Sequence, residues 1–241
     1  MTQTLNQLPP DKQPKVIFLD AMGTLFDLKT SVGEIYQDFA GKYGVEVNSK
    51  QIQQAFIKSF KSAPPLAFSP KELTIIKQQE FNWWKQVVET TFQQLTVREK
   101  FTDFDAFFSE VYFYFETIEP WYVFPDTIDS LRRWRDRGIE LGVISNFDSR
   151  LIKVLNLLEL DQFFTSTTIS SIAGFAKPEA NIFQIALAKH DITCKAALHI
   201  GDNPVEDYEG AIKAGLRSFW LNRHARLLNL DNQLPNLCSL G

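Results

Sequence analysis

The spacing of apolar residues changes twice along the chain. Val16 to Leu19 are four apolar residues in a row, which predicts a short buried strand that runs directly into Asp20. From about residue 29 onward, apolar residues recur every three or four positions, a period typical of amphipathic helices. After Pro120, short apolar runs alternate again with helical stretches. The pattern therefore divides the chain into a strand, a helical stretch and an alternating part.

The helical stretch contains four predicted helices and no predicted strand. They cover about residues 32–43, 49–62, 69–92 and 104–116, the third beginning at Ser69-Pro70. Trp83 and Trp84 belong to a stripe of aromatic residues that could stack on a ring-shaped substrate. Aromatic residues at helical spacing are more often core residues, so we interpret the stripe as packing within an all-α insertion.

The part after Pro120 alternates between predicted helices and strands. Helices are predicted from Pro125-Asp126 to Gly138, from a cap at Asp148 or Ser149, after Pro178, and from Pro204 to Lys213. Strands are predicted at about residues 139–144, 164–170, 196–200 and 217–221. Alternation of this kind predicts an α/β fold, a Rossmann-like parallel sheet with helices on both faces. No element is predicted for residues 227–241.

Composition and charge exclude several function classes. The 241 residues are 44% hydrophobic and 22% charged, which is ordinary for a globular protein with a sizeable core. A net charge of −4 and dispersed positive residues argue against nucleic acid or an anionic membrane as the main partner. The two cysteines, Cys194 and Cys238, suggest neither a disulfide framework nor a cysteine zinc site, so we expect a cytoplasmic protein.

The first 13 residues are polar and contain Pro9 and Pro10, without the apolar centre of a signal peptide. We expect them to form a disordered tail. No apolar run approaches the roughly 20 residues that cross a bilayer, so we expect no membrane partner.

Polar side chains stand at the ends of four predicted strands. They are Asp20, the pair Ser145-Asn146, Lys177, and Asp202 with Asp207. Ligands of open α/β sheets bind outside the carboxyl ends of the strands, so we expect these groups to form one site. Each of these residues alone is also common in turns, but the joint arrangement favours a site.

This set suits a phosphate group together with a divalent cation. Mg²⁺ prefers carboxylate oxygens, which Asp20 and Asp202 supply. Lys177 can offset phosphoryl charge, and the Ser145 hydroxyl can donate to phosphoryl oxygens. Asp207 would orient Lys177 or a metal-bound water.

The same residues resemble the four motifs of the haloacid dehalogenase-like (HAD) hydrolase superfamily. The motifs are Asp20-Ala21-Met22-Gly23-Thr24-Leu25, Ser145-Asn146, Lys177-Pro178, and Gly201-Asp202 with Asp207, and the match spans Val16 to Leu221. The segments SNFDSRL, GFAKPEANIFQIAL and NWWKQVVETTF resemble the branch named for an insect rhythmically expressed gene product. The helical stretch lies where subfamily I carries an α-helical cap. The resemblance implies a HAD-like core of residues 14–29 and 119–241 and a cap of residues 30–118.

The resemblance also implies a mechanism, that of a Mg²⁺-dependent phosphatase acting on a small phosphorylated metabolite. Asp20 would attack the phosphoryl group and form an aspartyl-phosphate that water hydrolyses. Mg²⁺ would be held by Asp20, Asp202 and the main-chain carbonyl of Met22. The phosphoryl oxygens would be held by Thr24, Ser145, the Asn146 amide and Lys177. The cap would close over the site and select the leaving group.

Position 22 departs from the family pattern. HAD phosphatases usually place there a second Asp that protonates the leaving group, whereas Met22 has a thioether that transfers no proton. General acid–base catalysis contributes about 10²–10⁴-fold, so we expect a preference for acyl or aryl phosphates unless another group substitutes. Asp27 and cap residues are possible substitutes between which the sequence does not choose.

Two alternatives remain at this point. A metal-independent 2-haloacid dehalogenase also lacks the second Asp, but no Arg precedes Arg98 to bind its substrate, and the Gly-Asp start of the fourth motif is present here. A non-catalytic protein could keep the phosphate and metal pocket without turnover. The substrate and the choice between monomer and homodimer stay open.

Overall fold

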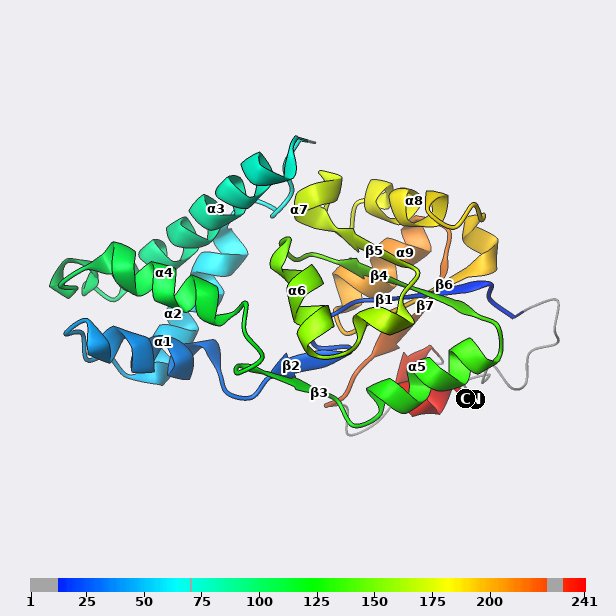
Figure 1. Cartoon of the computed structure of the whole chain (residues 1–241), viewed down its shortest axis with the longest axis horizontal. Coiled ribbons are helices and arrows are strands. Elements are labelled where there is room, and N and C mark those ends of the chain that lie inside the picture. Colours follow the sequence, from blue (N-terminus) through cyan, green and yellow to red (C-terminus); the bar gives the residue numbers. More distant parts are fainter. Residues whose placement is uncertain (1–12, 70, 225–231) are drawn as a thin grey trace. The chain divides into compact units, whose positions relative to one another are not determined.

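The computed structural model describes residues 13–69, 71–224 and 232–241 (Figure 1). The predicted disordered tail therefore lies outside the described residues, except for Gln13. The chain forms two compact units. Of the described residues, 13–27, 67–69, 123–224 and 232–241 form one unit, the α/β unit, and residues 28–66 and 71–122 form the other, the helical unit.

The α/β unit is built on a six-stranded sheet with the order β5-β4-β1-β6-β7-β8, in which all neighbouring strands are parallel. The strands are β1 (Val16–Leu19), β4 (Glu140–Ser145), β5 (Ser166–Ile169), β6 (Ala197–Gly201), β7 (Arg217–Leu221) and β8 (Gln233–Leu234). All four residues of β1 are buried, as its unbroken apolar run predicts. The predicted α/β fold is thus confirmed.

Helices cover both faces of this sheet. They are α5 (Thr127–Asp136), α6 (Arg150–Leu157), α7 (Ser170–Ala173), α8 (Ala180–Ala188) and α9 (Gly210–Lys213). In Figure 1, α8 and α9 lie on one face and α5 on the other. Phe18 and Ile144 of the sheet pack with Ile182 and Phe183 of α8 in one buried cluster. The core therefore fixes the strands whose ends carry the candidate site residues.

Some boundaries of the α/β unit differ from the prediction. The β-branched run predicts a strand through Ser170, but β5 ends at Ile169 and Ser170 begins α7. The predicted helix from Pro204 to Lys213 is divided into a π-helical segment, η6 (Pro204–Glu209), and α9. Asp148, one of the two predicted caps of α6, accepts a hydrogen bond from Arg150 N at 3.0 Å, whereas Ser149 makes no side-chain cap.

The helical unit consists of α1 (Val32–Lys42), α2 (Ser49–Ser62), α3 (Leu73–Gln94) and α4 (Phe104–Tyr114). Ser31, Asn48 and Asp103 cap α1, α2 and α4 through their side chains. The predicted start of α3 at Ser69-Pro70 is wrong, because the helix begins at Leu73. Two short paired strands, β2 (Phe26–Leu28) and β3 (Trp121–Val123), were not predicted.

Aromatic side chains form the core of the helical unit. Phe92 and Phe107 are fully buried, with ring centroids 5.3 Å apart, and Phe101 packs on both. Trp84 stacks on Phe60, and Trp83 donates from Nε1 to a main-chain carbonyl. The aromatic stripe therefore packs within the unit, as predicted.

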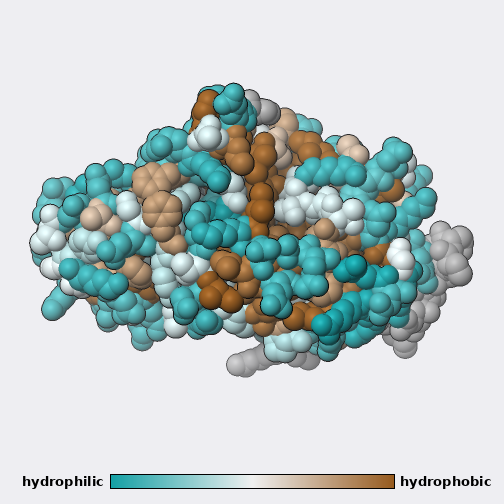
Figure 2. Space-filling view, viewed as in Figure 1, coloured by the Kyte–Doolittle hydropathy of each residue, from teal (hydrophilic) through white to brown (hydrophobic). Residues whose placement is uncertain are grey.

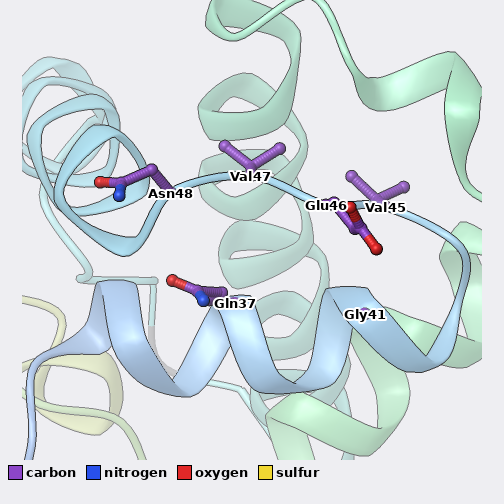
Figure 3. A pocket seen from close by; sticks show the side chains of 6 residues that line it. All are labelled: Gln37, Gly41, Val45, Glu46, Val47 and Asn48. Carbon is purple, nitrogen blue, oxygen red and sulfur yellow. The ribbon is translucent and has the colours of Figure 1, made fainter.

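An open pocket of about 470 Å³ lies along α1, between Gly41 and the segment that leads to α2. Figure 3 shows Gln37 pointing from α1 toward this segment, where its Oε1 accepts a hydrogen bond from Ser49 N. Glu46 is the one charged residue among those that line the pocket. The pocket therefore lacks a cluster of catalytic groups.

Hydrophilic residues cover most of the face shown in Figure 2. The longest described helix, α3, has 22 residues and carries several charged side chains. Among the described helices none is both long enough and apolar enough to span a membrane.

Candidate active site

Three neighbouring strands deliver the central residues of the site. Asp20 follows β1, Ser145 ends β4, and Asp202 follows β6. Because β1 lies between β4 and β6, and parallel strands are about 4.8 Å apart, these side chains meet at one edge of the sheet. Oxygens of Asp20, Asp202 and Asp207 lie within 4.8 Å of one another. The structure thus brings together groups that the sequence placed at separate strand ends.

Lys177 joins two of these carboxylates. Its Nζ donates to Asp20 Oδ1 at 2.7 Å and to Asp207 Oδ1 at 2.5 Å, and the residue is only 4% exposed. Burial lowers the pKa of this ammonium, but Asp20 and Asp207 outweigh burial and raise the pKa above its ordinary value. Lys177 is therefore a fixed positive charge beside Asp20.

Both carboxylate oxygens of Asp207 accept hydrogen bonds. Oδ1 also accepts from His199 Nε2 at 2.9 Å, and Oδ2 accepts from Asn203 N at 3.0 Å. Burial disfavours ionisation, but Lys177 and His199 hold the pKa of Asp207 well below its usual range. A β-carbon at Gly201 would overlap the Asp207 carboxyl group. With its oxygens bonded in this way, Asp207 is suited to position Lys177 rather than to bind a metal.

Asp20 is the buried carboxyl group of the site, with 8% of the residue exposed. Burial raises its pKa, Lys177 lowers it and Asp207 raises it again, and the net effect is upward. The Ser145 hydroxyl donates a hydrogen bond to the same carboxylate. A candidate nucleophile is therefore held by an ammonium and a hydroxyl.

Asp202 is exposed, although protein atoms surround its carboxyl group. This partial desolvation, followed by the charges of Asp20 and Asp207, raises its pKa to about 7. Gly23 approaches it so closely that a β-carbon there would lie 2.6 Å from the carboxyl carbon. No described residue donates a hydrogen bond to the main-chain carbonyl of Met22. Two crowded carboxylates and an unused carbonyl are a donor set that fits Mg²⁺.

The side chain of Asn146 is engaged by Lys177 and Glu206. Its Oδ1 accepts from Lys177 N at 2.7 Å, and its Nδ2 donates to Lys177 O at 2.8 Å and to Glu206 Oε2 at 3.0 Å. The side chain therefore holds the main chain of Lys177. The predicted contact of the Asn146 amide with phosphate stays a prediction.

Thr24 is completely buried, and its hydroxyl has no hydrogen-bond partner among the described residues. Its main-chain carbonyl accepts from Arg223 Nη2 at 2.7 Å. The predicted contact of Thr24 with phosphate stays a prediction.

Two residues of this cluster, His199 and Glu206, were not singled out in the sequence. His199 is buried in β6 and holds Asp207. Glu206 precedes Asp207 and bonds to Asn146. The signal for His199 is a titratable residue inside an apolar strand that ends in Gly-Asp, and the signal for Glu206 is a second acid beside Asp207.

Comparison with known proteins identifies the family. Residues 14–215 match the family model described as haloacid dehalogenase-like hydrolase. Human haloacid dehalogenase-like hydrolase domain-containing protein 3 is 33% identical over 209 residues, which cover 86% of this chain and 81% of the relative. The Drosophila melanogaster rhythmically expressed gene 2 protein is 26% identical, and the match covers 92% of each chain.

Solved structures agree on the fold. A HAD phosphatase from Thermococcus onnurineus superimposes with a TM-score of 0.65 at 20% identity, covering 94% of this chain and 95% of that chain. L-2-haloacid dehalogenases share the fold at 14% and 18% identity. At these identities the structures show the fold alone. The family model and the two relatives, in contrast, show that the chain is a hydrolase of the haloacid dehalogenase-like family, in the branch that contains the rhythmically expressed gene 2 protein.

Proposed function

We propose that this hydrolase is a Mg²⁺-dependent phosphatase that acts on a small phosphorylated metabolite through Asp20. The observation that carries the proposal is the pairing of Asp20 with Lys177 at 2.7 Å, beside the carboxyl group of the exposed residue Asp202. A buried ammonium suits a phosphoryl group, and an exposed acid next to the nucleophile suits a hard cation.

The residues have distinct roles in the proposed reaction. An oxygen of Asp20 attacks phosphorus in line while the bond to the leaving group breaks, and water later hydrolyses the aspartyl-phosphate. Lys177, Ser145 and the Asn146 N–H hold the phosphoryl oxygens, and Asp207 keeps Lys177 in place. Mg²⁺, held by Asp20, Asp202 and the Met22 carbonyl, would neutralise phosphoryl charge.

The dehalogenase alternative uses Asp20 as well but requires no metal. It gives no role to Asp202, whose carboxyl group lies against Gly23 beside the nucleophile. The crowding of Asp202 with Asp20 and Asp207 supports a cation-binding role and therefore favours the phosphatase.

Hydrolysis of p-nitrophenyl phosphate and acetyl phosphate, with and without Mg²⁺, tests the proposal. We expect Mg²⁺-dependent turnover by the wild type, none by Asp20→Asn, and wild-type turnover by the control Asp129→Asn, an exposed acid of α5. Halide release from 2-chloropropionate without Mg²⁺ would establish the dehalogenase instead. Equal background signals from wild type and Asp20→Asn on a panel of phosphorylated metabolites would indicate a non-catalytic binder.

A further inference from the structure

Glu206 reaches the candidate site from the first turn of η6. Asn146 Nδ2 donates to its Oε2 at 3.0 Å. The same Asn146 side chain accepts a hydrogen bond from the main-chain N–H of Lys177 and donates one to its main-chain carbonyl. Oε1, the second carboxyl oxygen, has no hydrogen-bond partner among the described residues. One oxygen of Glu206 is thus anchored, and the other is available to a substrate or to water.

The surroundings of Glu206 raise the pKa of its carboxyl group above the ordinary value. The residue is half-buried, and burial, together with the negative charges of Asp207 and Asp20, raises its pKa, against the opposing effects of Lys177 and Asn146. A carboxyl group that keeps a proton closer to neutral pH than usual can both donate and accept one during turnover. Partial exposure lets it exchange that proton with water.

The other acids of the cluster are already engaged. Asp20 is the nucleophile, and Asp202 is the acid suited to the cation. Asp207 accepts hydrogen bonds from Lys177, His199 and Asn203 N, and its pKa is held far below the range needed for proton transfer. Glu206 is therefore the acid of this cluster that is free to transfer a proton.

We propose that Glu206 performs the proton transfers for which Met22 has no suitable group, a role that rests on the proposed phosphatase function. In the first step the Glu206 carboxylic acid protonates the leaving oxygen as its bond to phosphorus breaks and the Asp20–phosphorus bond forms. In the second step the Glu206 carboxylate takes a proton from the water whose oxygen attacks phosphorus. Asp20 and inorganic phosphate are released, and Glu206 has regained its proton.

The test compares Glu206→Gln with Glu209→Gln, a matched control on the same segment η6, where Glu209 is exposed and pairs with Lys213 at 3.3 Å. The substrates are glycerol phosphate, a poor leaving group, and p-nitrophenyl phosphate, a good one. We expect Glu206→Gln to lower kcat for glycerol phosphate by about 10²–10⁴-fold. With p-nitrophenyl phosphate it should release one nitrophenolate per enzyme in a burst, because phosphorylation stays fast while hydrolysis of the aspartyl-phosphate slows.

Binding of Mg²⁺ and of inorganic phosphate, measured by calorimetry, should be unchanged in Glu206→Gln. If Glu206 only held Asn146 and Lys177 in place, the substitution would weaken this binding as well. Adding Met22→Asp to Glu206→Gln should restore turnover of glycerol phosphate by about tenfold or more. Met22→Asp alone, in the wild-type background, should raise turnover of glycerol phosphate by less, since Glu206 already supplies the proton.

Equal losses on both substrates without a burst, or no loss on either, would overturn the role of Glu206 while leaving the phosphatase intact. If Asp27→Asn loses turnover and Glu206→Gln keeps it, the proton transfers belong to Asp27. A wild type without any Mg²⁺-dependent phosphatase activity would overturn the proposed function and this proposal together.

Discussion

A β-carbon at Gly23 would lie 2.6 Å from the carboxyl carbon of Asp202. The loop after β1 can approach the end of β6 this closely only because residue 23 has no side chain. Gly23 also has a φ of +81°, in the left-handed region that favours glycine. The first and fourth motifs are therefore in direct contact, and residue 23 determines the position of a proposed metal ligand.

Gly23→Ala should weaken Mg²⁺ binding by about 10–100-fold, since the new methyl group displaces the Asp202 carboxylate. It should also lower the free energy of unfolding by about 1–2 kcal/mol through backbone strain. Gly138→Ala is the matched control, because Gly138 has a φ of +75° but a β-carbon there meets no atom within 4 Å. Calorimetric titration and thermal melts check both variants, and equal Mg²⁺ affinities would contradict the prediction.

Mg²⁺ should stabilise the protein more at pH 8 than at pH 6. The pKa of Asp202 is about 7, so a proton competes with the metal at the lower pH. The ionised fraction rises from about one tenth to nine tenths over this interval, which predicts an apparent affinity about tenfold higher at pH 8.

Without metal, the contribution of Asp202 to folding stability changes with pH in the opposite direction. The folded carboxyl group retains its proton up to a higher pH than the unfolded one, so Asp202 makes stability fall as pH rises from about 4 to 7. Melting temperatures with and without Mg²⁺ at both pH values measure these effects. Asp202→Asn should remove the difference between pH 6 and pH 8 in stabilisation by Mg²⁺. A wild type that Mg²⁺ stabilises equally at both pH values would contradict the prediction.

Lys177→Met should leave Asp20 and Asp207 buried without their cation. Breaking a buried ion pair costs about 3–5 kcal/mol, so we expect a large drop in the free energy of unfolding and loss of phosphatase activity. Lys213→Met, which breaks the exposed pair with Glu209, should change stability by about 0.5 kcal/mol or less. Urea denaturation compares them, and similar midpoints for the two variants would show that the ammonium of Lys177 is dispensable.

Phe107→Ala should destabilise the helical unit by about 3–5 kcal/mol, because the ring is fully buried among Phe92 and Phe101. Phe113 lies on the same helix, α4, but is 54% exposed. Phe113→Ala should therefore cost about 0.5 kcal/mol or less. Thermal melts followed by circular dichroism distinguish them, and comparable losses would mean that burial does not determine the contribution of these rings.

The sheet and the strand-end residues could be predicted because their signals are local. An apolar run followed by Asp20 or by Gly201-Asp202 defines both a buried strand and the polar group at its end. The start of α3 could not be predicted, because Ser69-Pro70 has the pattern of a helix start. The helix begins instead after Glu72, which makes no side-chain cap. β8 has only two residues, too few to show a period.

The role of Asn146 and the position of Glu206 depend on tertiary contacts. Asn146, Lys177 and Glu206 come from three separate segments of the chain, and no spacing rule in the sequence relates them. A motif suggests that a Ser-Asn pair approaches phosphate. Only the folded chain shows that the Asn146 side chain is bonded to Lys177 and Glu206 and is therefore not free to bind phosphate.

The bond between Lys177 and Asp20 joins residues 157 positions apart. The ends of this very long loop must meet before the ion pair exists, and such distant contacts form slowly. A chain released from the ribosome before Lys177 is made would carry the nucleophile without its ammonium. Recovery of activity after denaturation would therefore report the completion of folding rather than the formation of individual helices.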